Sequence, residues 1–236
     1  MVTGGSGNIG RAIVSAFLAR GAVVVIADSN GGAAIALADD CKAMGGRALA
    51  MTVDVSDAAK MEALVARSLA EFGRIDAFAN NAGITQVGAA PMAEVDEALF
   101  DRILAINLKG VWLGMRSVIP AMECQGGGST INISSTAGLV GTPGYGAYGA
   151  AKHGVIGLTR AAALEYGAKG IRINAVCPGM MASGMQQTSV RQDGREDIAR
   201  VMQPALGRSI RPEEIAAAIL YLASDSAQAM RGAARS

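Results

Sequence analysis

The chain alternates between short runs of β-branched and apolar residues and longer segments with helical periodicity. The short runs are apolar enough to be buried on both faces of a parallel sheet. They predict strands at Val23–Ala27, Ala48–Val53, Ile75–Ala79, Thr130–Ser134 and Arg172–Val176. The longer segments predict helices at Ile9–Arg20, Gly32–Met44, Ala58–Phe72, Glu97–Met122, Tyr145–Tyr166 and Pro212–Leu222. This alternation indicates successive βα units, and hence an α/β fold with a parallel sheet flanked by helices.

Nothing in the pattern divides the chain into separate domains. No internal repeat, low-complexity tract or proline-rich linker interrupts it, so we expect one domain over residues 1–236. Within that domain, residues 180–206 are rich in Met, Gln, Ser and charge, which predicts a segment that covers a bound substrate. The tail at 227–236 lacks the alternation of a strand.

Composition and charge narrow the classes of partner. With 51% hydrophobic and 17% charged residues, the chain is predicted to fold around a large aliphatic core. A formal net charge of +1, without a run of like charges, argues against nucleic acid and a charged membrane as partners. The three cysteines are widely spaced and there is one histidine, so we expect neither a metal site nor a disulfide. The sequence has no pattern of a secretion signal and no long apolar run, which predicts a cytoplasmic protein.

A glycine-rich turn opens the chain and leads directly into the first predicted helix. It reads Thr3-Gly4-Gly5-Ser6-Gly7-Asn8-Ile9-Gly10-Arg11-Ala12. Such a turn lets backbone N–H groups and a helix N-terminus approach a pyrophosphate. Similar glycines also occur in loops that bind nothing, so the turn needs support from its context. The residues of the turn that we expect to contact a dinucleotide are Gly4, Ser6, Asn8, Ile9 and Gly10.

Asp28 provides that context, because it ends the predicted strand Val23–Ala27 eighteen residues after Gly10. An acidic side chain about 20 residues beyond such a turn accepts hydrogen bonds from the ribose hydroxyls. A 2′-phosphate would face the same carboxylate, and Ser29 and Asn30 follow rather than Arg or Lys. The sequence therefore favours NAD over NADP, although aspartate is also common in turns and helix caps.

Further motifs follow in a fixed order, most of them at the ends of predicted strands. They are Asp54-Val55, Asn80-Asn81-Ala82-Gly83, Asn107 in Ile106-Asn107-Leu108, Ser135 in Asn132-Ile133-Ser134-Ser135, Tyr148-Gly149-Ala150-Ala151-Lys152 and Pro178-Gly179. Each motif alone is weak evidence, and a Tyr-x-x-x-Lys pair is close to chance. Together with the glycine turn, they make the chain resemble the short-chain dehydrogenase/reductase family over nearly its whole length.

The resemblance implies a Rossmann-type, doubly wound sheet and an oxidoreductase that moves a hydride between NAD(H) and a small-molecule secondary alcohol or ketone. For the cofactor site it implies contacts of Asp54 and Val55 with adenine, a floor of Asn81, Ala82 and Gly83, and closure of the nicotinamide side by Pro178, Gly179 and Met181. It also implies a homodimer or homotetramer formed through the long helices at Glu97–Met122 and Tyr145–Tyr166.

Tyr148 and Lys152 form the pair with the clearest chemistry. Four residues apart on a predicted helix, the two side chains share one face. A phenol with its reference pKa of about 10 is a poor base at neutral pH, but a nearby ammonium favours phenolate and lowers that pKa. Tyr148 would then exchange a proton with the substrate oxygen while Lys152 holds the nicotinamide ribose. In isolation, a packed tyrosine beside a solvated lysine is the more common arrangement.

Two further residues complete the predicted catalytic set. Ser135 lies thirteen residues before Tyr148, which is the spacing of the family pattern, and its hydroxyl would stabilise charge on the substrate oxygen. Neighbouring Ser134 is the competing candidate and is expected to serve the strand end. Asn107 would hold a water that links Lys152 to solvent, and a buried asparagine that satisfies a kinked helix is the alternative.

Three features depart from the family pattern. Asn8 stands where the middle glycine of the turn is expected, and asparagine tolerates positive φ better than most other residues. Only Met1-Val2-Thr3 precede the turn, which predicts a truncated first strand, and the tail at 227–236 predicts that the last strand is missing. An NADP-dependent oxoacyl or ketone reductase stays open as an alternative. The altered ends add a second, a nucleotide-binding scaffold with impaired catalysis.

Overall fold

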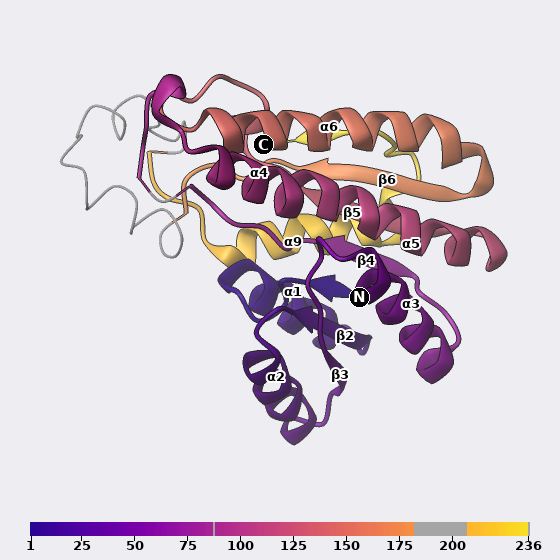
Figure 1. The fold of residues 1–236 in the computed structure, drawn as a ribbon. Coiled ribbons are helices and arrows are strands. Elements are labelled where there is room, and N and C mark those ends of the chain that lie inside the picture. The colour runs from indigo at the N-terminus through magenta and orange to yellow at the C-terminus, as the bar shows by residue number, and fades with distance from the viewer. Residues whose placement is uncertain (87, 182–206, 236) are drawn as a thin grey trace.

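A computed structural model of the chain describes residues 1–86, 88–181 and 207–235. At its centre lies a parallel sheet with the strand order β3-β2-β1-β4-β5-β6-β7 (Figure 1). The strands are β1 (Val2–Thr3), β2 (Val23–Asp28), β3 (Arg47–Thr52), β4 (Ala77–Asn80), β5 (Gly128–Ile133), β6 (Ile171–Val176) and β7 (Ala234–Arg235). The order runs outward in one direction from β1 and in the other from β4. The predicted doubly wound sheet is therefore confirmed, with its switch point between β1 and β4.

Helices cover both faces of the sheet. On one face lie α1 (Asn8–Leu18), α2 (Gly31–Ala43) and α9 (Pro212–Ala223), and on the other lie α3 (Ala58–Phe72), α5 (Gly110–Cys124) and α6 (Gly146–Tyr166). α4 (Glu97–Leu104) precedes α5, and short 3₁₀ turns occur at Met92–Glu94, Thr136–Gly138, Gly167–Lys169 and Asp225–Ala227. Among the helices that the structure describes, none is long and apolar enough to cross a membrane.

β2 is apolar from Val23 to Ala27 because both faces of the sheet are buried there. Val24 and Ile26 join the core beneath α1, α2 and α9, while Val25 and Ala27 join the core beneath α3, α5 and α6. Alternate side chains of a strand point to opposite faces, so a strand between two helical layers can be apolar at successive positions.

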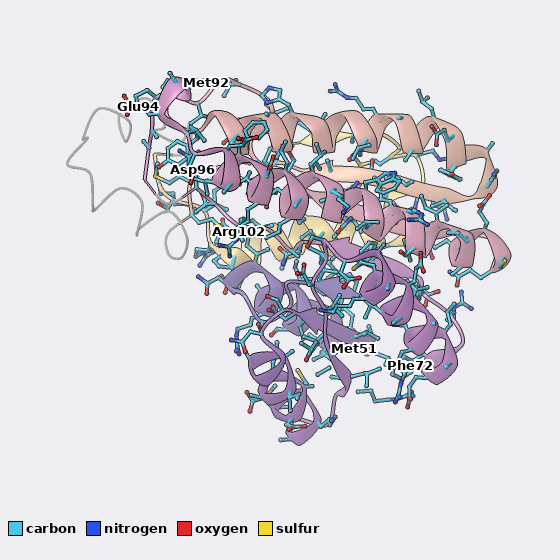
Figure 2. All side chains as sticks on the ribbon, in the orientation of Figure 1. Met51, Phe72, Met92, Glu94, Asp96 and Arg102 are labelled. Carbon is cyan, nitrogen blue, oxygen red and sulfur yellow. The ribbon has the colours of Figure 1, made fainter. Side chains whose placement is uncertain are left out.

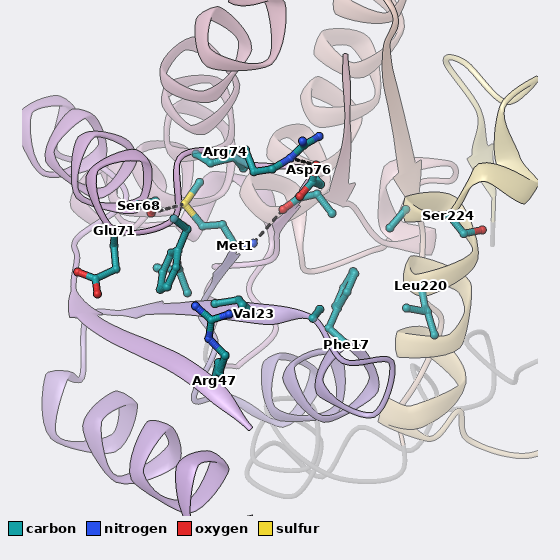
Figure 3. Close-up of a pocket in the computed structure, with 16 residues that line it drawn as sticks. Met1, Phe17, Val23, Arg47, Ser68, Glu71, Arg74, Asp76, Leu220 and Ser224 are labelled. Atoms are coloured by element: carbon teal, nitrogen blue, oxygen red, sulfur yellow. Dashed lines mark hydrogen bonds and ion pairs between the residues drawn. The ribbon is translucent and has the colours of Figure 1, made fainter. Parts of the chain in front are cut away.

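The first strand, β1, spans two residues and lies in the middle of the sheet. Val2 pairs with Ile26 of β2 on one side and with Ala79 of β4 on the other. The amine of Met1 donates a hydrogen bond of 2.8 Å to the carbonyl of Ala77, and burial lowers the pKa of this amine to about 5. A pocket of about 570 Å³ adjoins Met1 where β2 and β4 begin, with Phe17 on its wall (Figure 3).

The prediction that the last strand is missing is wrong, because β7 extends the sheet beside β6. Ala234 and Arg235 pair in parallel with Ala175 and Val176. Two backbone hydrogen bonds join the tail to β6, from the N–H of Ala175 to the carbonyl of Ala233 and from the N–H of Gly232 to the carbonyl of Ile173. Asn174 adds two more, since its Nδ2 donates to the carbonyl of Met230 at 2.8 Å and its Oδ1 accepts from the N–H of Ala233 at 3.1 Å. This attachment uses backbone groups of the tail, so the side-chain pattern of 227–236 does not reveal it.

The predicted helix Glu97–Met122 is interrupted near its middle. Residues Ala105–Lys109 form a π-helical turn between α4 and α5, with Asn107 buried at its centre. π-Turns inside α-helices are rare and are frequently found at functional sites. This irregularity lies at the asparagine that the sequence marks as a candidate.

Candidate active site

Two neighbouring spaces lie where the strands of the sheet end. The larger is a cleft of about 720 Å³ and the smaller a pocket of about 110 Å³. Both are lined by Ile9, Asn81, Gly83, Ile84 and Met181, so they form one continuous site. Open α/β sheets bind ligands at this edge, next to the switch point. The volume of the cleft also falls within the roughly 300–1,000 Å³ that is typical of small-molecule sites.

The structure gathers the residues predicted to bind the cofactor around this site. The cleft is lined by Gly4, Ser6, Asn8, Ile9, Gly10, Asp28, Asp54, Val55, Asn81, Ala82, Gly83 and Met181. The pocket is lined by Ser135, Tyr148, Lys152, Pro178, Gly179 and again Met181. Asn107 is the one predicted site residue that lines neither space. The segment expected to cover a substrate lies, at 182–206, outside the described residues.

The glycine turn is shaped by close backbone contacts. Gly4 has a φ of +60°, and a Cβ at Gly10 would lie 2.1 Å from the carbonyl oxygen of Gly4. Gly7 precedes α1 and Asn8 is the first residue of the helix. Within the described part of the chain no non-glycine residue has a positive φ, so the tolerance expected of Asn8 is not needed. The first turn of α1 carries no acidic residue, which leaves its N-terminus suited to an anion.

Thr3 joins the glycine turn to the segment after β4. Its buried Oγ1 accepts hydrogen bonds from the N–H groups of Asn81 at 3.0 Å and Ala82 at 3.1 Å. In return, the side-chain Nδ2 of Asn81 donates to the carbonyls of Thr3 and Gly4. Thr3 is absent from the predicted site, and its position before the glycines is the only signal for it in the sequence.

Asp28 is oriented by the backbone on both sides of its carboxylate. One oxygen accepts the N–H of Ser6 and the other accepts the N–H of Asn30, each at 3.0 Å. The carboxylate is therefore fixed at the end of β2, on the wall of the cleft. Each carboxylate oxygen has two lone-pair directions, so acceptor capacity remains for the hydroxyls of a ribose.

Asp54 lies further along the same wall. Its Oδ1 accepts from the N–H of Ser56 at 2.9 Å and from the hydroxyl of Ser56 at 2.7 Å. These two hydrogen bonds, the side-chain one first, lower the pKa of Asp54. The carboxylate is thus held in its charged form in the loop that leads to α3, next to buried Val55.

Ser135 and Tyr148 meet in the smaller pocket. Ser135 follows β5, and a hydrogen bond joins its side chain to Tyr148. Burial raises the pKa of Tyr148, and the hydrogen bond with Ser135 opposes that shift only in part. From the sequence, a lowered pKa is expected for Tyr148, because the positive charge of Lys152 can be inferred from the spacing of the two residues. The burial of the phenol cannot be inferred in this way, and it stabilises the neutral form.

Lys152 is enclosed by the protein and points toward the strand end. Its Nζ donates to the carbonyl of Ile133 at 2.8 Å and lies 5.6 Å from the centre of the Tyr148 ring. Burial lowers the pKa of Lys152 to about 8. The more common arrangement of a solvated lysine is therefore not what the structure shows, because Lys152 is only 4% exposed.

Ser134 and Asn107 have structural partners. Ser134 donates to the backbone carbonyl of Lys152 at 2.8 Å and so ties α6 to the end of β5, as expected for the competing serine. Asn107 bonds the backbone of Ile84, since it accepts from the N–H at 2.8 Å and donates to the carbonyl at 2.7 Å. The alternative for Asn107 is a buried asparagine that satisfies a kinked helix, but these contacts are made to Ile84, in the segment after β4.

Several lining residues belong to no motif. Ile84 follows the Asn81-Ala82-Gly83 segment, while Arg102 comes from α4 and Ala105 begins the π-turn after it. The only hint that the sequence offers for Arg102 and Ala105 is that they precede Asn107 by five and two residues. Among the described residues, no group of three or more His, Cys, Asp or Glu side chains is placed to hold a metal ion.

Known proteins resemble the chain over almost its full length. The family model described as enoyl-(acyl carrier protein) reductase matches residues 4–235. A 2,5-dichloro-2,5-cyclohexadiene-1,4-diol dehydrogenase from Sphingobium indicum is 42% identical over 234 residues, which cover 98% of this chain and 92% of the relative.

Two solved structures share the fold. The crystal structure of a levodione reductase matches with a TM-score of 0.91 and 36% identity, covering 99% of this chain and 93% of that one. An NAD⁺-bound xylitol dehydrogenase matches with a TM-score of 0.93 and 29% identity, and the match covers 99% of this chain and 95% of that one.

Proposed function

The chain belongs to the short-chain dehydrogenase/reductase family and is an oxidoreductase of CH–OH groups, and on this premise we propose that it moves a hydride between NAD(H) and a secondary alcohol or its ketone. One observation carries the proposal. Ser135, Tyr148 and Lys152 meet in a pocket that continues into the cleft formed by the glycine turn and Asp28. Groups suited to proton transfer therefore adjoin a space suited to a dinucleotide.

Tyr148 is the general acid and base of this proposal. In alcohol oxidation its Oη takes the proton of the substrate hydroxyl, and in ketone reduction it returns a proton to the substrate oxygen. Ser135 donates a hydrogen bond to the same oxygen and stabilises the negative charge that develops there. When bound, NAD accepts or supplies the hydride. The remaining donors of the Lys152 ammonium, beyond the one given to Ile133, hold the nicotinamide ribose.

The raised pKa of Tyr148 affects ketone reduction and alcohol oxidation differently. Because burial raises this pKa, the phenol is protonated at neutral pH and ready to act as the acid in reduction. Oxidation needs the phenolate, which positive charge nearby would stabilise. The Lys152 ammonium and the charge of an oxidised nicotinamide both act in that direction.

The preference for NAD rests on Asp28. Its carboxylate is fixed at the end of β2 by two backbone N–H groups and cannot turn away from a ligand without losing them. A ribose 2′-hydroxyl can donate to such a carboxylate, whereas a 2′-phosphate is repelled by it. The NAD⁺ bound by the xylitol dehydrogenase supports the same choice.

Cyclic secondary alcohols and ketones are the first substrates to test. The relatives named above act on a chlorinated cyclohexadienediol and on levodione. Turnover of a panel of cyclic and open-chain secondary alcohols would show whether the enzyme prefers cyclic substrates or accepts secondary alcohols in general.

The proposal is tested by nucleotide binding and turnover with one protein preparation. We expect NADH to bind more tightly than NADPH and Tyr148→Phe to lower kcat by about 10²–10⁴-fold with little change in NADH affinity. Tyr166→Phe is the matched control, because Tyr166 ends the same helix far from the pocket and should turn over normally. Full activity of Tyr148→Phe would contradict the assigned role.

The two alternatives predict other results. A preference for NADPH, with turnover of oxoacyl substrates, would favour the NADP-dependent reductase, in keeping with the acyl-carrier description of the matching family model. Folded protein that binds neither nucleotide would favour the scaffold with impaired catalysis.

We further propose a homodimer formed through α5 and α6. An apolar groove of about 630 Å³ runs along these helices, lined by Leu104, Leu108, Trp112 and Leu158. The Trp112 side chain is 44% exposed, an unusual state for the one tryptophan of the chain. Light scattering should give twice the chain mass for the wild type and the monomer mass for Trp112→Glu. Met44→Glu, at the end of α2, is the control, and a monomeric wild type would contradict the proposal.

A further inference from the structure

The charges that line the larger cleft are unevenly distributed. Among the described residues around it, Asp28 and Asp54 carry the carboxylates and Arg102 is the one cation. Both carboxylates already accept hydrogen bonds from neighbouring N–H or hydroxyl groups. A dinucleotide would add two negatively charged phosphates to this space. The N-terminus of α1 offers only about half a positive charge to balance them.

Arg102 has no internal partner in the described part of the chain. No hydrogen bond or ion pair joins its side chain to any residue within 1–86, 88–181 or 207–235. Its helical neighbours three and four positions away are Ala98, Leu99, Ala105 and Ile106, none of which is charged. Adjacent Asp101 lines the apolar groove beside Trp112 instead, on another side of the helix.

The side chain is directed at the cleft. Arg102 extends from α4 toward the end of α1 at which that helix begins (Figure 2). Ala105 and Ile106, one turn further along, line the same cleft, and so do Ser6, Gly7 and Asn8 at the start of α1. An anion in the cleft would therefore have two sources of positive charge near it, the guanidinium and the helix N-terminus.

From this arrangement we infer that Arg102 is a cofactor-binding residue that pairs with the phosphate oxygens of the dinucleotide. Its planar guanidinium presents several donors at once, which suits bidentate binding of phosphate. Arg102 acts on binding and not on proton or hydride transfer. The inference rests on the proposed function, because it assumes that a dinucleotide occupies this cleft.

The experiment compares ligands with and without phosphate. Calorimetric titration of the wild type and of Arg102→Gln with NADH, ADP and adenosine gives a dissociation constant for each. We expect Arg102→Gln to weaken NADH and ADP by roughly tenfold, the loss of about one charge-assisted hydrogen bond, and to leave adenosine unchanged. Added salt should weaken ADP binding less steeply in the variant than in the wild type.

Arg20→Gln is the matched control. Arg20 is also exposed, but it follows the other end of α1 and does not line the cleft, so this change alters the net charge equally without touching the site. Unfolding curves of both variants should match that of the wild type, since both side chains are exposed.

Three outcomes would overturn the inference. Equal weakening of ADP and adenosine would show that Arg102 acts on the adenosine part or on the fold. ADP binding that changes no more in Arg102→Gln than in Arg20→Gln would remove the local role while leaving the proposed function intact. A wild type that binds none of the nucleotides would overturn the proposed function, and this inference with it.

Discussion

Lys152 carries a charge that the surrounding protein disfavours, and this has a measurable consequence. Its pKa is about 8 in the folded protein against 10.5 as the ordinary value, so the unfolded chain binds more protons between these pH values. Stability therefore rises with pH across this window, because deprotonation removes the cost of the buried ammonium. Relative to Lys152→Met, the wild type should gain up to about 3 kcal/mol in free energy of unfolding from pH 8 to 10.5.

Urea unfolding of both proteins at several pH values measures this difference. Groups that titrate in both proteins cancel in the comparison. A difference that stays constant between pH 8 and 10.5 would contradict the buried ammonium.

Asp28 is predicted to set the choice between the two nucleotides. Replacing it in Asp28→Ser removes the negative charge that would face a 2′-phosphate and weakens the acceptor for the ribose hydroxyls. We expect the ratio of the dissociation constants of NADH and NADPH to shift toward NADPH by about tenfold or more. Titration with both nucleotides gives the ratio. Asp57→Ser, which alters the cap of α3 outside the cleft, should leave it unchanged.

At the level of single residues, motif order was enough to predict which side chains come together. Ser135, Tyr148 and Lys152 line one pocket although they come from different elements. What the sequence could not give was the environment of each group. The pKa of Tyr148 is raised because packing around the pocket buries the phenol, and no local spacing contains that information.

The side chain of Asn107 ties the π-turn between α4 and α5 to the segment that follows β4. Asn107 satisfies both the N–H and the carbonyl of Ile84, so Asn107→Ala would leave these backbone groups without partners. We expect a loss of about 2–4 kcal/mol in free energy of unfolding, measured by urea denaturation. For comparison, Asn30→Ala removes the cap of α2, a more exposed contact, and should cost about 1 kcal/mol. Equal losses in the two variants would contradict this role of Asn107.

At the level of elements, the sequence predicts long periodic segments well and their irregularities poorly. The predicted helix Glu97–Met122 exists, but the pattern shows no sign of the π-turn, because one widened turn hardly disturbs the apolar periodicity. β4 begins two residues later than predicted and ends one residue later. β7 was not predicted, because the tail lacks an apolar alternation. Hydrogen bonds between Asn174 and the backbone of the tail hold it beside β6.

For the whole molecule, the buried amine of Met1 predicts a second pH dependence. Its pKa is about 5 in the folded chain against 8.0 as the ordinary value, so a chain that begins at Met1 binds more protons when unfolded between these pH values. Stability should rise from pH 5 to 8, by at most about 4 kcal/mol, as the amine becomes neutral. The N-acetylated chain has no such titration and serves as the control. The free energy of unfolding of both chains is measured by urea denaturation at several pH values. The same pH dependence in the two chains would contradict the prediction.

The overall architecture was the easiest level to predict, because it follows from many residues at once. Alternating βα segments indicated the layers, and the glycine turn together with Asp28 indicated the position of the larger cleft, at the ends of β1 and β2. The pocket next to Met1 was not foreseen, since it depends on how Phe17 of α1 and Leu220 of α9 pack beyond the start of the sheet (Figure 3).

The central position of β1 bears on how the two halves of the sheet are joined. β2, β3 and α2 are connected to the rest of the sheet through β1 and through the packing of α1 on α9. A dinucleotide that reaches from Asp28 beyond β2 to Tyr148 beyond β5 would span this seam from outside. The cofactor would then also connect the two halves of the sheet. The melting temperature of the protein would rise with the cofactor concentration, because a ligand that binds only the folded state stabilises it.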